Sequence, residues 1–121
     1  MKHRNFVVLV VEDEPYLRLE TVDLIEEAGF STVEAINADE AIKILESRND
    51  IRVVLTDIGL PGSIDGMKLA STIRDRWPPI DLIITSGQFN PNPDDLPMRS
   101  YFFAKPYDPT KLVQALTTFV A

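Results

Sequence analysis

Acidic, hydroxyl and amino side chains occur where short apolar runs of this sequence end. These residues are Glu12, Asp13, Asp57, Ser86 and Lys105. If the runs are parallel strands, these side chains meet at one edge of a sheet, where the carboxyl ends of the strands form binding sites. Three carboxylates about 4 Å apart would repel by roughly 4 kcal/mol per pair at an effective dielectric near 20. Such a cluster therefore needs a cation.

The residue types in the cluster indicate which ligands it would hold. Oxygen ligands without His or Cys suit Mg²⁺, which takes one or two carboxylates together with waters and phosphate oxygens. The ammonium group of Lys105 is a point charge suited to a phosphoryl oxygen, and the Ser86 hydroxyl can donate to another. We therefore predict a site for magnesium and a phosphoryl group at this edge.

Each residue also has an ordinary structural interpretation when it is taken alone. The acids after the first run could cap the following helix, and Asp57 could cap the end of a strand. Ser86 could bond to the backbone, and Lys105 before a proline could be a solvated loop residue. Complementary chemistry at four separate strand ends favours a functional cluster over four independent structural roles.

The elements that position the cluster are short strands separated by helices. Continuous, β-branched apolar runs are typical of strands that are buried on both faces of a parallel sheet. The sequence predicts strands at 6–11, 31–36, 51–57, 82–86 and 101–104. Strands that alternate with helices predict right-handed βαβ units, so we expect an α/β fold with helices on both faces of the sheet.

Helical spacing of apolar residues places the helices between these strands. The first begins near Pro15, buries Leu17 among others and ends at Gly29, whereas the last begins at Asp108 or Pro109. The segment 88–98 contains three prolines, which exclude a regular helix there. We expect that segment to have few internal hydrogen bonds and to be loosely held.

The composition narrows the function classes. At 121 residues the chain predicts a single domain over 1–121, and its net charge of −7 argues against direct nucleic-acid or anionic membrane binding. The sequence has no Cys and one His, which excludes disulfides and thiolate catalysis and disfavours zinc. The run 6–11 is too short for a membrane span or a signal peptide. We expect a cytoplasmic location.

Four motifs together resemble the receiver domain of two-component response regulators. They are VEDEP at 11–15, TDIGLPG at 56–62, SG at 86–87 and KPY at 105–107. The resemblance extends from Val7 to Val120. It implies a flavodoxin-like, doubly wound sheet of five parallel strands in the order 2-1-3-4-5. In departure from the family, the prolines in 88–98 predict that the helix before the fifth strand is short or absent.

The resemblance also implies roles for the acidic residues. Asp57 would be the phosphoacceptor, since an Asp carboxylate is a competent nucleophile towards phosphorus. Asp13 and Asp57 would bind Mg²⁺, the backbone carbonyl of Gly59 would be a further ligand, and Glu12 would hold the ion through water. Lys105 would pair with Asp57 at rest and with the phosphoryl group afterwards.

Signalling follows from the same resemblance. Ser86 would be the switch hydroxyl and Phe102 the switch aromatic residue. The donor would be a phosphohistidine on a histidine kinase or phosphotransfer protein, because the sequence has no GxxxxGK[ST] loop for ATP. The phosphorylated form would act on a downstream protein. The domain would assist its own phosphorylation and dephosphorylation without being an enzyme in the usual sense.

Two departures from the family pattern affect the surfaces that dock partners, and two alternative function classes stay open beside the receiver. The loop at 61–66 is one residue longer than usual, and the Pro-rich segment 88–98 replaces a helix. An aspartyl-phosphate phosphatase of the haloacid dehalogenase type is one alternative, although Gly59 stands where that class has a second Asp. A phosphorylation-independent interaction module is another alternative. The intact set of Glu12, Asp13, Asp57 and Lys105 argues against it, because such a module would not need these residues.

Overall fold

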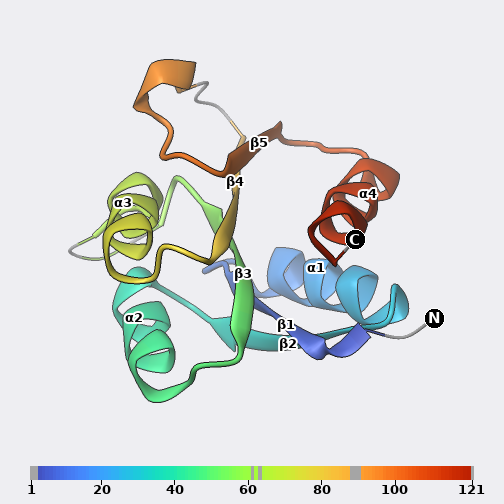
Figure 1. Cartoon of the computed structure of the whole chain (residues 1–121). Coiled ribbons are helices and arrows are strands. Elements are labelled where there is room, and N and C mark those ends of the chain that lie inside the picture. The colour runs from blue at the N-terminus through green and yellow to red at the C-terminus, as the bar shows by residue number, and fades with distance from the viewer. Residues whose placement is uncertain (1–2, 61, 63, 88–90, 121) are drawn as a thin grey trace.

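Parallel strands form a central sheet with helices on both faces (Figure 1). The computed structural model describes residues 3–60, 62, 64–87 and 91–120. The five-stranded sheet has the order β2-β1-β3-β4-β5. The strands are β1 (His3–Val11), β2 (Phe30–Ala35), β3 (Ile51–Asp57), β4 (Asp81–Ser86) and β5 (Ser100–Ala104). The predicted fold class and strand order are confirmed.

The helices divide between the two faces of the sheet (Figure 1). They are α1 (Pro15–Glu27), α2 (Ala38–Ser47), α3 (Gly66–Arg76) and α4 (Pro109–Val120). α2 and α3 cover one face, and α1 and α4 cover the other. β1 supplies both layers, because Leu9 packs on the α2–α3 side and Val10 on the α1–α4 side. This double burial explains why the first run is apolar without alternation.

Side chains just before the helices fix where they begin. Glu14 accepts hydrogen bonds from the amides of Tyr16 and Leu17 at the start of α1. Asn37 and Asp65 cap α2 and α3 in the same way. Each cap satisfies amides that have no partner inside the helix, so the strand-to-helix turns beside the sheet edge are fixed.

Several predicted boundaries and burials differ from the structure. β1 begins at His3, β2 spans Phe30–Ala35, and β5 begins at Ser100. Leu17 is 38% exposed, so the prediction that it belongs to the core is wrong. Its neighbour Thr21, one turn further along α1, is buried. The spacing of apolar residues correctly identified which side of α1 faces the sheet. It did not show how much of that side the neighbouring elements shield from solvent.

The connection from β4 to β5 contains one short 3-10 helix, η1 (Pro93–Asp95), within its described part. Residues 88–90 lie outside the described residues. The prediction of a short or absent helix is therefore confirmed for 91–99. The segment is held from outside, however, because the Arg74 guanidinium donates to the carbonyls of Met98 at 2.7 Å and Arg99 at 3.4 Å. The end of this segment near β5 therefore bonds to α3 through contacts that the sequence did not predict.

Candidate functional site

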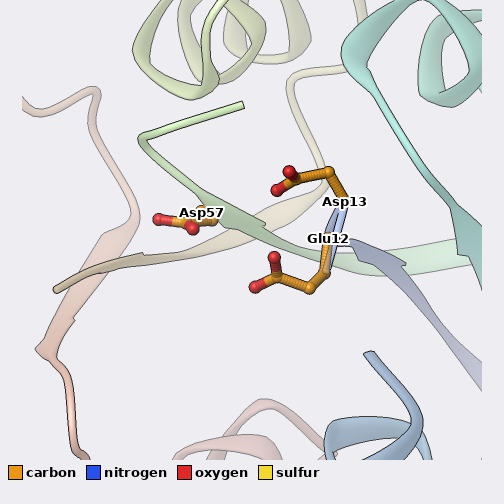
Figure 2. Close-up of side chains that lie close together, drawn as sticks. All are labelled: Glu12, Asp13 and Asp57. Carbon is orange, nitrogen blue, oxygen red and sulfur yellow. The ribbon is translucent and has the colours of Figure 1, made fainter. Parts of the chain in front are cut away.

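Three carboxylates meet at the carboxyl edge of the sheet, where β1 and β3 end side by side. Glu12 and Asp13 directly follow β1, and Asp57 is the last residue of β3 (Figure 2). One oxygen of each lies within 4.8 Å of the others. Glu12 is 6% exposed, Asp57 is half-buried and Asp13 is exposed. Predicted neighbours from two strands are thus brought together.

Lys105 joins this cluster from the end of β5. Its Nζ lies 3.0 Å from Asp57 Oδ2 and 3.1 Å from Glu12 Oε1. The Lys105 amide donates to the Ser86 carbonyl at 2.7 Å, which holds the backbone of Lys105 against the end of β4. The pair with Asp57 was predicted, whereas the bond to Glu12 was not.

Burial and pairing together set the charges in the cluster. Burial raises the pKa of Glu12, although the Glu14 amide and the Lys105 ammonium oppose this rise. Burial alone would lower the pKa of Lys105, but its hydrogen bonds to Asp57 and Glu12 outweigh this effect and the pKa is raised. Lys105 therefore stays protonated and counters part of the negative charge.

Two residues that the sequence analysis did not single out support the acids. Arg18 on α1 donates to the Glu12 carbonyl at 3.0 Å and to Glu34 Oε1 at 3.0 Å. Gly66, at the start of α3, lies against the β3 end, and a Cβ there would overlap the carbonyl oxygen of Asp57. The Gly66 amide also donates to the Ile58 carbonyl at 3.0 Å. A glycine directly after the Asp65 cap was the only sequence signal for this close contact.

The remaining predicted site residues lie around Asp57 at different depths. Gly59 is exposed, and its amide is 3.3 Å from Asp57 Oδ1. Ser86 is 5% exposed and lies at the end of β4, one residue after the residue paired with Asp57. Phe102 lies opposite Ile84 in the register and packs, half-buried, on the α2–α3 side of the core. The structure therefore gathers Gly59 and Ser86 at the site and places Phe102 below it on β5.

The donor set fits the magnesium ion that the sequence suggested. The clustered ligand atoms are carboxylate oxygens from Glu12, Asp13 and Asp57. Such hard oxygen donors suit Mg²⁺, which retains waters and binds phosphate oxygens as well. Because Lys105 already contacts two of the carboxylates, the exposed Asp13 is the acid most accessible to an ion.

None of the helices that the structure describes has the length and apolar character needed to span a membrane.

The sheet order and the acid–lysine cluster at its carboxyl edge define a signalling module of the receiver type. The family model of the response regulator receiver domain matches residues 8–117. The chain belongs to this family of two-component signalling proteins.

Similar proteins include a full-length regulator, a kinase and a solved receiver domain. A Rickettsia conorii protein described as an NtrX-like response regulator is 35% identical over 91% of this chain and 24% of its own length. The autoinducer sensor kinase/phosphatase CqsS of Vibrio cholerae is 30% identical over 93% of this chain and 17% of its own. The receiver domain of NtrX from Brucella abortus is 27% identical, with a TM-score of 0.81 over 93% of this chain and 97% of that domain. The chain thus spans about a quarter or less of these two longer relatives.

Proposed function

We propose that this domain accepts a phosphoryl group on Asp57 in a magnesium-dependent reaction and changes its binding to a partner as a result. The observation that carries the proposal is the placement of Lys105 Nζ, 3.0 Å from Asp57 Oδ2 beside two further carboxylates. Phosphoryl transfer requires alignment and charge neutralisation more than covalent chemistry from the protein. The cluster offers a nucleophile, a cation and ligands for a second cation.

In the proposed reaction, a carboxylate oxygen of Asp57 attacks the phosphorus of a phosphohistidine. The new O–P bond forms as the P–N bond breaks, and the electron pair of that bond passes to the imidazole. Lys105 leaves the Asp57 carboxylate for a phosphoryl oxygen, and Ser86 donates to another. Mg²⁺ held by Asp13, Asp57 and the Gly59 carbonyl, and by Glu12 through water, would neutralise charge on the phosphoryl oxygens.

The proposed phosphodonor is a histidine kinase or a histidine phosphotransfer protein. The match to a sensor kinase/phosphatase supports this class of partner. The sequence has no phosphate-binding loop of the GxxxxGK[ST] type, so ATP is not proposed as a direct donor. A downstream protein, and not nucleic acid, would respond to the phosphorylated form. We assign residues 1–121 to one receiver domain and place it in the cytoplasm.

Gly59 argues against the phosphatase alternative. A haloacid-dehalogenase-type site needs a second Asp two residues after its nucleophile, and Gly59 supplies no side chain there. Its neighbourhood is open, since a Cβ added at Gly59 would meet nothing within 4 Å. The bound phosphoryl group would therefore lack the acid that such phosphatases use for turnover.

Intact-mass measurement tests the proposed phosphorylation. The chain is incubated with acetyl phosphate and Mg²⁺, with chelator as a parallel condition. We expect one added phosphoryl group on the unchanged protein and on Asp75→Asn, an exposed carboxylate control on α3. We expect none on Asp57→Asn or after chelation. Labelling of Asp57→Asn would sink the assignment, and undiminished labelling in chelator would refute the metal requirement.

A further inference from the structure

A cleft of about 620 Å³ lies beside the acid–lysine cluster, between α1 and the residues that follow β5. Leu17, Thr21 and Leu24 line it from α1, and Tyr107 lines it from the opposite wall. Glu12 and Lys105 also line it, so the cleft adjoins the site described above. Its volume falls within the range of roughly 300–1,000 Å³ that small-molecule sites occupy.

Apolar surface dominates this cleft, and one polar pair crosses it. Leu17 is left 38% exposed on the α1 wall. Thr21 Oγ1 and the Tyr107 hydroxyl lie 3.1 Å apart and join α1 to the segment after Lys105. Each hydroxyl can both donate and accept, so beyond its mutual bond the pair retains one donor hydrogen and acceptor lone pairs for further hydrogen bonds inside the cleft. An apolar lining with a few convergent polar groups is typical of a ligand site.

The charges around the cleft favour a cation. Lys105, the one cationic residue of its lining, already bonds to Glu12 and Asp57. Glu20 lines the cleft from an exposed position on α1, and the salt bridges among the described residues do not involve it. The chain as a whole carries a net charge of −7, which adds to the attraction.

We propose that this cleft binds a small amphiphilic organic cation, namely an amine with an aromatic or branched aliphatic body. The body covers Leu17 and Leu24, and the ammonium group pairs with Glu20. The Thr21–Tyr107 hydroxyl pair lies within reach of a polar group on the ligand. This inference goes beyond the proposed function and does not depend on it, because binding is expected on the unphosphorylated protein without metal.

Three probes of one shape separate charge from apolar contact. They are 2-naphthylmethylamine, neutral 2-naphthylmethanol and anionic 2-naphthoate, titrated into the full chain and followed by backbone amide NMR. We expect shifts in α1 and in residues 105–109. We expect the amine to bind about two- to fivefold more tightly than the alcohol, as an exposed ion pair allows, and the naphthoate to bind most weakly.

Variants on α1 locate the site. Leu17→Trp should fill the cleft and weaken amine binding at least about tenfold, as loss of the buried apolar contact implies. Leu19→Trp, on the same helix at a position that is 56% exposed and outside the cleft lining, should leave binding unchanged. Glu20→Gln should make the amine and the alcohol bind equally without altering the fold.

Each other outcome overturns the proposal. The cleft is not the site if the amine causes no shifts at millimolar concentration, or if shifts centre on the neighbouring groove along α4 around Val113 and Gln114. The assignment to a cation fails if the three probes bind the unchanged protein equally. Melting curves of both Trp variants verify that they fold, and Glu20→Gln decides the question if Leu17→Trp does not.

Discussion

Lys105 connects two carboxylates, and its removal tests whether its role is signalling or structure. Lys105→Ala should impair the phosphorylation-dependent conformational change more than it impairs folding. Glu12 is buried and loses a hydrogen-bond partner in this variant, so we also expect a stability loss of about 1–3 kcal/mol. Thermal melting and amide NMR with acetyl phosphate and Mg²⁺ measure the two effects.

The contrary result for Lys105 is equally clear. A folded Lys105→Ala protein whose spectrum changes fully on phosphorylation would remove Lys105 from the signalling mechanism. Lys105→Arg serves as the control, since it keeps the charge and should retain more of the response than the alanine variant. If Lys105→Ala unfolds, the residue is structural and the Arg variant alone reports on signalling.

Asp13 should lower the stability of the protein when no metal is present. Its carboxylate oxygen lies within 4.8 Å of oxygens from Glu12 and Asp57. Asp13→Asn relieves this repulsion, so we expect the metal-free protein to gain about 1 kcal/mol, or a few degrees in melting temperature. The same variant should lose most of the stabilisation that added Mg²⁺ gives. Melting curves with Mg²⁺ and with chelator decide this, and an undiminished Mg²⁺ effect would contradict it.

Gly66 illustrates a residue whose importance comes from backbone contact. Its added Cβ would overlap the backbone of Asp57, with the carbonyl carbon at 2.7 Å. Gly66→Ala should therefore destabilise the protein by about 2 kcal/mol or more and displace the end of β3. Gly87→Ala is the matched control, because its Cβ would meet nothing within 4 Å. Equal urea midpoints for the two variants would show that β3 and α3 can move apart to accommodate a Cβ at position 66 without loss of stability.

Among the elements, α3 holds the connection before β5 through Arg74, which replaces part of what a regular helix there would provide. Its guanidinium also donates to the carbonyls of Pro78 at 2.7 Å and Ile80 at 2.9 Å, so it joins the residues before β4 to those before β5. Arg74→Met removes the guanidinium donor from these carbonyls, and we expect a loss of about 1–3 kcal/mol together with faster amide exchange near Met98. Hydrogen exchange and urea denaturation measure this.

A matched variant on the same helix provides the comparison for Arg74. Arg76 forms an exposed ion pair with Glu46 at 2.8 Å. Arg76→Met should cost at most about 1 kcal/mol and leave exchange near β5 unchanged, because exposed pairs contribute little. Similar effects from Arg74→Met and Arg76→Met would show that the carbonyl contacts do not hold the segment.

The sequence predicted the sheet and most of the site because both depend on local signals. Apolar runs with polar ends located Glu12, Asp13, Asp57 and Lys105, and a parallel sheet necessarily brings such ends to one edge. The contacts of Arg18 and Arg74 could not be predicted, because both side chains bind backbone carbonyls, and every residue type has a carbonyl. Met98 also lies far from Arg74 in the sequence. The exposure of Leu17 likewise depends on how α1 packs against the segment after β5.

For the whole molecule, the half-buried packing of Phe102 would limit the strength of the proposed switch. Burying a phenyl ring contributes roughly 1.5–3 kcal/mol, but Phe102 already packs half-buried against the core. Further burial of the ring can therefore add less than this free energy. A full reversal of a two-state equilibrium, from 1:99 to 99:1, requires a change of about 10⁴-fold in the equilibrium constant. We therefore predict a graded change that a partner's binding completes.

Hydrogen exchange with and without a phosphoryl mimic tests this graded switch. We expect altered protection in the segment before β5 and around Phe102, with little change at α2. Unchanged protection there, together with dimerisation of the phosphorylated protein through α4, would show that the signal leaves the domain by another surface.

Chemical marking of the phosphorylated residue shows whether Asp57 carries the phosphoryl group. Borohydride reduces an aspartyl phosphate to homoserine, so peptide mass spectrometry after phosphorylation and reduction identifies the modified position. We predict homoserine at Asp57 alone. Homoserine at Asp13, or none at Asp57 in protein that has gained a phosphoryl group, would rule out Asp57 as the phosphoacceptor.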